Sequence, residues 1–315
     1  MPPGPQVRRW RPDWPVSLSG SLGSLARGRR DPAYRRTPDG AVWRTMRTPD
    51  GAATQRLTVD RSSGSDDVEV ESQAWGPGAA WATERLPLTL GAADDVTTFD
   101  PSPHPLVVEL WNRFGAGLRT PAVGVVLEVL VAAVLEQRVT GIESRHSWRW
   151  LLTAYGEPAP GPVPEGMHVF PEPAAVAAIP SWEWHRAGVE RARSDTIVRA
   201  ASYAGRIEEC ATMPLDAART RLRALPGVGV WTVAEVAQRC LGDADAVSFG
   251  DFHVAHTVCY ALDGDTDGTD ERMAELLEPW RESGHRGRVV RLVERSGISR
   301  PARGPRYSPL DHRRH

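Results

Sequence analysis

Residues 225–253 read LPGVGVWTVAEVAQRCLGDADAVSFGDFH, and the pattern of this segment predicts the most about the structure. Pro226 is followed by two glycines, Gly227 and Gly229, which flank Val228. This composition is typical of a tight turn whose backbone can adopt positive φ. Apolar residues recur at helical spacing before and after the turn. The stretch therefore predicts a helix, a glycine hairpin and a second helix.

The N-terminus of a helix that follows glycines presents unpaired N–H groups, which suit a phosphate. A plain helix-to-helix turn would need the same glycines, so the hairpin alone leaves both interpretations open. The aspartate downstream of the hairpin favours the phosphate-binding interpretation. Asp251 ends a Gly/Asp/Ser loop, and an apolar-periodic run from Val254 to Leu262 follows it.

The hairpin, its second helix and the GDFHV segment resemble the helix-hairpin-helix DNA glycosylases, specifically the 3-methyladenine DNA glycosylase II group. The similarity extends in outline over roughly residues 10–300. It implies an α+β protein, in which a small antiparallel-sheet N-terminal domain precedes a mostly α-helical, two-lobed glycosylase region with a helix-hairpin-helix motif. It also implies double-stranded DNA with a damaged base as the partner.

This resemblance identifies Asp251 as the catalytic residue. Cutting an N-glycosidic bond builds positive charge on the sugar, so a fixed anion near C1′ would stabilise that charge and orient or deprotonate the attacking water. The base itself has to be held in an extruded position. An aspartate at the start of a helix is more ordinarily an N-cap, and that role stays open beside the catalytic one.

Trp231 stands two residues after the second hairpin glycine, where family members with lyase activity carry a lysine. All 38 basic residues of the chain are arginine, so the resemblance implies base release without strand cleavage. In the 3-methyladenine group a tryptophan at this place lines the base pocket, where its electron-rich face attracts cationic alkylated purines. Simple packing in the core is the alternative. Glu235 replaces an aromatic of the family pocket, and either bonds an exocyclic amine or pairs with an arginine.

Residues 135–140 read LEQRVT and resemble the segment from which the family inserts a wedge into DNA in place of the extruded nucleotide. Arg138 falls at the wedge position and Gln137 lies beside it. A solvated helix end is the ordinary alternative. The other DNA contacts implied by the resemblance lie in the hairpin and the helix after it: Gly227, Val228, Gly229 and Thr232.

Together these residues predict a monofunctional glycosylase that flips and excises alkylated purines of the 3-methyladenine type in base excision repair. Two alternatives remain. One is a non-catalytic protein that uses the hairpin only as a phosphate clamp, and the other is a glycosylase for a deaminated or oxidised base.

Strand-like alternation over residues 41–70, with a turn signal at Pro49-Asp50-Gly51, predicts an antiparallel meander. Residues 123–135 are nearly all apolar, which predicts a central helix buried on every side. The expected division of the chain is a flexible tail at 1–9, a β-rich N-terminal domain at 10–98, an all-α glycosylase region at 99–300 and a flexible Arg/Pro-rich tail at 301–315.

The composition excludes some classes of protein but does not indicate a function. The formal net charge of −2 does not by itself indicate a nucleic-acid binder. No run approaches the roughly 18 apolar residues of a membrane span, and the N-terminus lacks the apolar core of a secretory signal. We therefore expect a cytoplasmic, nucleoid-associated monomer without a membrane partner.

Three cysteines, Cys210, Cys240 and Cys259, lie far apart without metal-ligand spacing. We expect no cofactor and no metal. A monovalent cation on the hairpin carbonyls is a family-level possibility that the residues leave open.

Overall fold

The computed structural model describes residues 4–61 and 68–301 of the chain. Near the N-terminus it holds a five-stranded antiparallel sheet with the order β1-β5-β4-β3-β2, so the predicted meander is confirmed. Its strands are β1 (Gln6–Trp10), β2 (Tyr34–Arg36), β3 (Val42–Thr48), β4 (Gly51–Arg61) and β5 (Val68–Trp75).

Helices make up most of the remainder, together with a two-stranded ribbon of β6 (Glu157–Pro158) and β7 (His168–Val169) inside the region expected to be all-α. The α-helices are α1 (Leu18–Leu22), α2 (Ala79–Glu84), α3 (Leu86–Thr89), α4 (Pro105–Phe114), α5 (Val126–Glu136), α6 (Gly141–Tyr155), α7 (Pro173–Ala177), α8 (Ser181–Arg186), α9 (Arg191–Ser202), α10 (Ala204–Glu208), α11 (Leu215–Arg223), α12 (Val230–Val236), α13 (Val254–Asp263), α14 (Asp270–Leu277) and α15 (Arg286–Ser296). The 3-10 helices are η1 (Gly23–Leu25), η2 (Gly115–Gly117), η3 (Glu209–Thr212) and η5 (Glu278–Trp280), and η4 (Ala237–Leu241) is a π-helix that continues α12.

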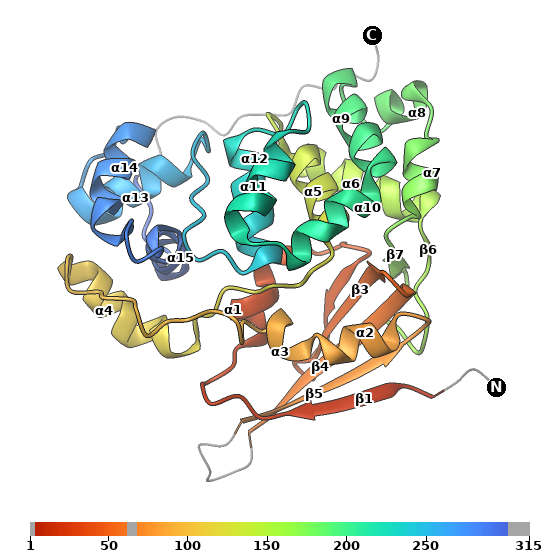
Figure 1. Ribbon diagram of the computed structural model, residues 1–315, viewed down its shortest axis with the longest axis horizontal. Helices are drawn as coiled ribbons and strands as arrows, with labels where there is room; N and C mark the ends of the chain where they lie inside the picture. Colours follow the sequence, from red (N-terminus) through yellow and green to blue (C-terminus); the bar gives the residue numbers. More distant parts are fainter. Residues whose placement is uncertain (1–3, 62–67, 302–315) are drawn as a thin grey trace.

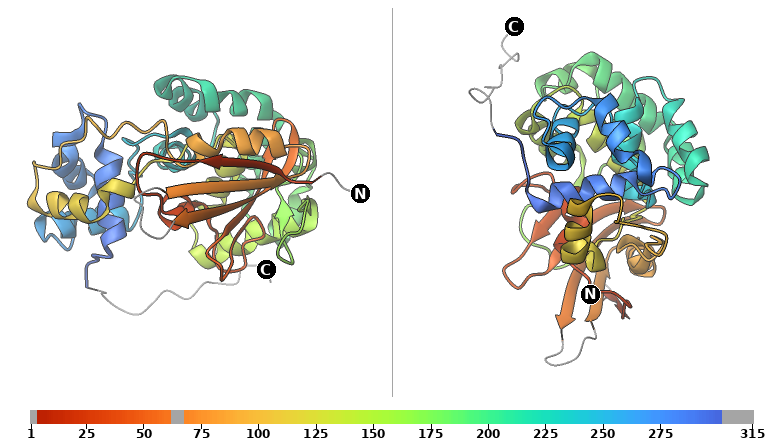
Figure 2. Two further views of the ribbon diagram at one scale, coloured as in Figure 1. Left: turned by 90° about the horizontal axis from the view of Figure 1, so that it is seen from below. Right: turned by 90° about the vertical axis from the view of Figure 1, so that its left-hand side faces the viewer.

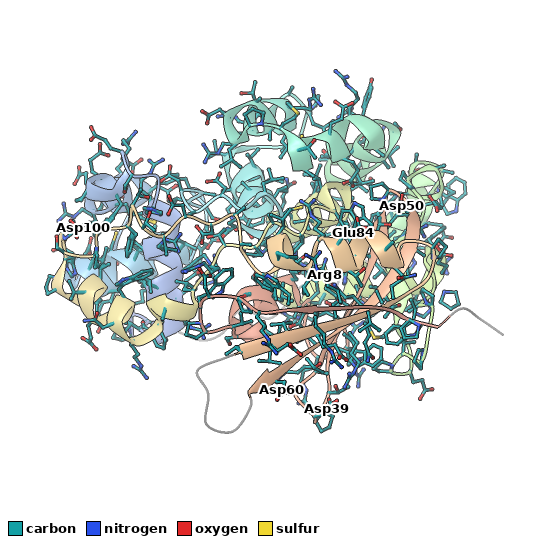
Figure 3. All side chains as sticks on the ribbon, turned by 60° about the horizontal axis from the view of Figure 1, so that its bottom comes forward. Arg8, Asp39, Asp50, Asp60, Glu84 and Asp100 are labelled. Atoms are coloured by element: carbon teal, nitrogen blue, oxygen red, sulfur yellow. The ribbon has the colours of Figure 1, made fainter. Side chains whose placement is uncertain are left out.

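The expectation of a flexible tail over residues 1–9 is wrong for the residues of β1, which pairs with β5 over its whole length. Arg9 forms an ion pair with Glu71 on β5 at 2.8 Å. Arg8 reaches the end of α2, where its Nη1 donates to the carbonyl of Glu84 at 2.6 Å (Figure 3). The composition did not indicate this edge strand, because its pairing with β5 uses backbone groups, which carry no sequence signal. Of the tail expected at 301–315, residues 302–315 lie outside the described residues.

Two hydrophobic cores organise the fold. The larger core joins sheet residues such as Leu57 to α5 residues such as Leu130 and to Val233 of α12. The smaller core joins Val107 of α4 to residues of α13, α14 and α15, among them Val258. The sequence boundary placed between residues 98 and 99 therefore does not separate two cores, because the apolar residues of α5 belong to the same core as the sheet and the neighbouring helices.

The two cores are visible as two groups of elements. The helices α4, α13, α14 and α15 gather at one end, at the left of Figure 1, while α5 to α12 lie over the sheet. Seen from below, the sheet covers one side of that second group (Figure 2). None of the helices in the described ranges has the length and hydrophobicity that a membrane span requires.

Candidate active site

The predicted glycine hairpin lies between α11 and α12. Gly227 has φ +92°, and a Cβ at this position would collide with the hydroxyl of Thr196 on α9. Gly229 has φ −95°, and a Cβ there would meet no neighbour. Only the first glycine is therefore demanded by the backbone and by packing.

The hairpin is fastened from two sides through its carbonyl groups. Thr196 Oγ1 and Arg199 Nη1 both donate to the carbonyl of Pro226 at 3.3 Å. Gln137 Nε2 donates to the carbonyl of Gly227 at 3.0 Å. No side chain caps the N-terminus of α12, so its first backbone N–H groups stay available to a ligand.

Two of the residues expected to contact DNA have buried side chains. Val228 packs into the larger core. Thr232 is 2% exposed, and its hydroxyl accepts a hydrogen bond from Gln137 Nε2 at 2.8 Å. The reason is helical geometry, because the first turn of α12 turns this face toward the end of α5. Any contact that Val228 or Thr232 makes with DNA is therefore through the backbone.

Arg138 projects from the turn between α5 and α6. It is exposed, and it is the only non-glycine residue with positive φ in the described part of the chain, at 54°. Its neighbour Gln137 is committed to the hairpin, so of the two wedge-segment residues only Arg138 has a free side chain. A left-handed conformation costs a non-glycine residue roughly 1–2 kcal/mol.

Asp251 and Trp231 contact each other, although Trp231 lies on a helix of the larger core and Asp251 directly precedes a helix of the smaller one. Trp231 Nε1 donates to Asp251 Oδ2 at 3.1 Å. The other carboxylate oxygen accepts from the backbone N–H groups of His253 at 2.8 Å and Val254 at 3.1 Å. Asp251 thus accepts from the backbone at the start of α13, whose N-cap residue is His253, and also holds the indole. Both side chains remain half-buried, so neither is lost in the core.

The segment that carries Asp251, residues 242–253, leads from η4 to α13 and is called the crossing loop below. Two of its aspartates fix it to helices on either side. Asp243 Oδ2 accepts from Arg219 Nε of α11 at 2.7 Å. Asp245 Oδ2 forms an ion pair with Arg286 of α15 at 2.5 Å.

Two further bonds fix the crossing loop near the site. Ser248 Oγ donates to Glu235 Oε1 of α12 at 2.5 Å, and the N–H of Gly250 donates to Asp270 Oδ2 of α14 at 2.6 Å. Gly250 has φ +86°, a conformation that favours glycine directly before the aspartate. The carboxylate of Asp251 is therefore carried by a loop that is bonded to four helices.

Glu235 is buried, and its carboxylate is fully engaged. It forms an ion pair with Arg239 on the next turn and accepts from Gln238 Nε2 at 2.8 Å in addition to Ser248. Of the two roles that the sequence left open, the structure contains the arginine pair. Glu235 lies behind Trp231 as a support for the crossing loop.

One carboxyl near the site escaped the sequence analysis. Glu294 of α15 is exposed and has no hydrogen bond or ion pair through its side chain in the described part of the chain. Although the residue as a whole is exposed, its neighbours shield the carboxyl from water, which raises the pKa of Glu294, and the charges of Glu235 and Asp251 raise it further. Arg239 and Arg291 act in the opposite direction. Nothing in the sequence pattern of this helix singled out Glu294.

No group of three or more His, Cys, Asp or Glu side chains in the described ranges has a geometry that could hold a metal ion. All three cysteines are buried and unpaired.

The hairpin geometry yields a matched pair of variants. Gly227→Ala should lower the free energy of unfolding by about 2 kcal/mol, since alanine is strained at positive φ and meets Thr196. Gly229→Ala should cost clearly less. Urea unfolding of the two variants measures the difference, and equal losses would contradict the geometry described for Gly227.

The chain is similar to known proteins both in sequence and in fold. No family model matches the chain. The chain is 38% identical over 143 residues to the probable bifunctional transcriptional activator/DNA repair enzyme AlkA of Mycobacterium tuberculosis. The match covers 43% of this chain and 27% of that protein, so the chain spans about a quarter of the length of the curated relatives it matches.

Solved structures align over nearly the whole chain. A 3-methyladenine DNA glycosylase from Archaeoglobus fulgidus superposes with a TM-score of 0.72 at 15% identity, covering 92% of this chain and 98% of the other. The apo form of the Clostridium acetobutylicum 8-oxoguanine glycosylase/lyase superposes with a TM-score of 0.65 at 11% identity, covering 93% and 98%. The chain therefore has the fold of the helix-hairpin-helix DNA glycosylases.

Proposed function

We propose that this chain is a monofunctional DNA glycosylase that extrudes an alkylated purine of the 3-methyladenine type and hydrolyses its N-glycosidic bond. The hydrogen bond between Trp231 and Asp251 carries the proposal. It places an aromatic surface and a fixed carboxylate side by side, at the place where the two cores meet.

Asp251 supplies the anion that this reaction needs. As the bond from C1′ to the base nitrogen breaks, positive charge develops on the sugar, and a carboxylate beside C1′ stabilises it without having to move. Water then attacks C1′, and Asp251 accepts the proton that the water loses. Three N–H groups hold the carboxylate in one orientation during these steps.

Trp231 would provide the wall against which the extruded base rests. Its Nε1 is occupied by Asp251, so the indole offers its face rather than a hydrogen-bond donor. The face of an indole attracts a cation, and an alkylated purine carries positive charge. A cationic base is also a good leaving group, which lowers the need for a general acid.

The hairpin would bind the DNA backbone, and Arg138 would insert into the duplex. The uncapped N–H groups at the start of α12 suit a backbone phosphate. Arg138, exposed on a turn that is held beside the hairpin by Gln137, would enter the space left by the extruded nucleotide.

The proposal excludes a lyase step. The side chain that forms a Schiff base with the opened sugar is the amine of lysine, and the sequence contains no lysine. Trp231 occupies the place at which lyase members of the resembled family carry that lysine.

Asp251→Asn separates catalysis from the hydrogen bonds at the start of α13. The amide oxygen of asparagine can still accept from the N–H groups of His253 and Val254, so the variant should keep its fold, although it loses the hydrogen bond from Trp231 Nε1. It lacks the negative charge, so release of a methylated purine from duplex DNA should fall at least about a hundredfold. Chromatography of the freed base under single-turnover conditions measures the rate.

Asp39→Asn serves as the control, because the Asp39 side chain is 53% exposed and pairs with Arg56 on the sheet, away from the crossing loop (Figure 3). It should release base at the rate of the unaltered chain. Undiminished release by Asp251→Asn would show that this aspartate only accepts hydrogen bonds at the start of α13.

Arg138→Gly tests the wedge through its backbone strain. Glycine adopts positive φ freely, so the variant should lose no stability and gain up to about 1 kcal/mol in the free energy of unfolding. Without the guanidinium, binding to a duplex with an abasic-site analogue should weaken several-fold. Fluorescence anisotropy measures the binding, with Arg36→Ala on the sheet as the control. Unchanged binding would remove Arg138 from the proposed interface.

A further inference from the structure

Phe252, which directly follows Asp251, is the most exposed large apolar side chain in the described part of the chain, at 71%. A phenyl ring left in water forgoes the free energy of burial, although single exposed apolar residues are common. The position of this ring, rather than its exposure alone, is informative.

Phe252 is held outward by its surroundings. Its ring packs edge-to-face against His253, with the centroids 5.0 Å apart, and lies 5.7 Å from the ring of His256. His256 Nδ1 donates to the carbonyl of Phe252 at 2.9 Å. Because the crossing loop is also bonded to its neighbouring helices, the exposed phenyl stands on a fixed support.

Two other exposed apolar side chains lie beside the other proposed DNA contacts. Val230, 45% exposed, is the first residue of α12 after the hairpin. Ile142, 62% exposed, lies in the first turn of α6, close after Arg138. Phe252 occupies the corresponding place beside Asp251, and it is the only aromatic of the three.

Resting on the proposed function, we propose that Phe252 stacks on a base next to the extruded nucleotide, on the same strand, as an aromatic contact separate from the Arg138 wedge. Asp251 has to face C1′ of the extruded nucleotide, so the next residue in the chain lies close to an adjoining nucleotide of that strand. Extrusion removes the stacking partner of that nucleotide. A phenyl ring can replace the lost partner whatever the base, because every base has a π-face.

Phe252 is in these terms a positioning residue. It touches DNA beside the reacting nucleotide and not the reacting atoms. Replacing it should therefore weaken DNA binding more than it slows the chemical step.

The test is a double-mutant cycle between protein and DNA. The full chain and its Phe252→Ala variant are titrated with a duplex that holds an abasic-site analogue, and with duplexes in which the 5′ or the 3′ neighbour is abasic as well. Phe252→Ala should weaken binding to the first duplex about tenfold. The loss should largely disappear for one of the two doubly abasic duplexes, where the stacked base is missing.

Further variants and measurements serve as controls for the stacking role. Phe252→Trp should bind as well as the unaltered chain, and Phe252→Leu should bind less well, because leucine is apolar but cannot stack. Trp182→Ala, which removes an aromatic that is 65% exposed on α8, should change nothing. In single-turnover base release at saturating enzyme, Phe252→Ala should keep its rate within about threefold, and urea unfolding should show an unchanged stability.

A tenfold loss that persists in both doubly abasic duplexes, equal binding by Phe252→Ala and the unaltered chain, or an equal loss in Trp182→Ala would each overturn the stacking role. These outcomes leave the proposed glycosylase function standing. If the unaltered chain fails to prefer the abasic duplex over undamaged DNA, the proposed function falls first, and the role of Phe252 falls with it.

Discussion

The hydrogen bond from Trp231 Nε1 to Asp251 Oδ2 depends on a constraint that lies outside both residues, which is the fixed course of the crossing loop between the two cores. The helix that carries Trp231 packs in the larger core, whereas Asp251 opens a helix of the smaller one. Left free, the two groups of helices could rock against each other and open the bond. The ion pairs of Asp243 and Asp245 tie the loop to α11 and α15 and so set the relative position of the cores.

A second consequence of this arrangement concerns α5. Its apolar surface forms the centre of the larger core, and its C-terminal end presents Gln137 to the hairpin and Arg138 to solvent. One helix thus sets the relative position of the hairpin backbone proposed to bind phosphate and of the proposed wedge. The strained φ of Arg138 fits this arrangement, because the chain has to turn sharply there while Gln137 stays bonded to Gly227.

Local signals in the sequence were sufficient to predict the hairpin and its helices, but not which side chains contact each other across the fold. The glycine hairpin and its helices were predictable, because positive φ at Gly227 and apolar periodicity are properties of neighbouring residues. The family resemblance assigned Trp231 and Asp251 to one active site, but it did not predict the hydrogen bond between them, since a separation of 20 positions carries no geometric information. Glu235 had two roles open until its partner Arg239 was seen, because only three-dimensional packing decides which charged groups meet.

Other features lay beyond sequence reasoning for the same reason. The edge strand β1 reads as a polar tail until β5 lies beside it. Thr232 and Gln137 both look like surface residues near a DNA contact, yet they bond each other at the junction of α5 and α12. The exposure of Phe252 appears only once its neighbours are known to leave it uncovered, and no periodic pattern marks it.

The most direct test of the account is the release of free base from a panel of duplexes, each with one alkylated, deaminated or oxidised base, with strand cleavage scored separately before and after alkali. The account predicts that the unaltered chain frees the alkylated purine and leaves the strand intact until alkali is added. Release confined to the deaminated or oxidised bases, strand cleavage without alkali, or DNA binding without release of any base would contradict it.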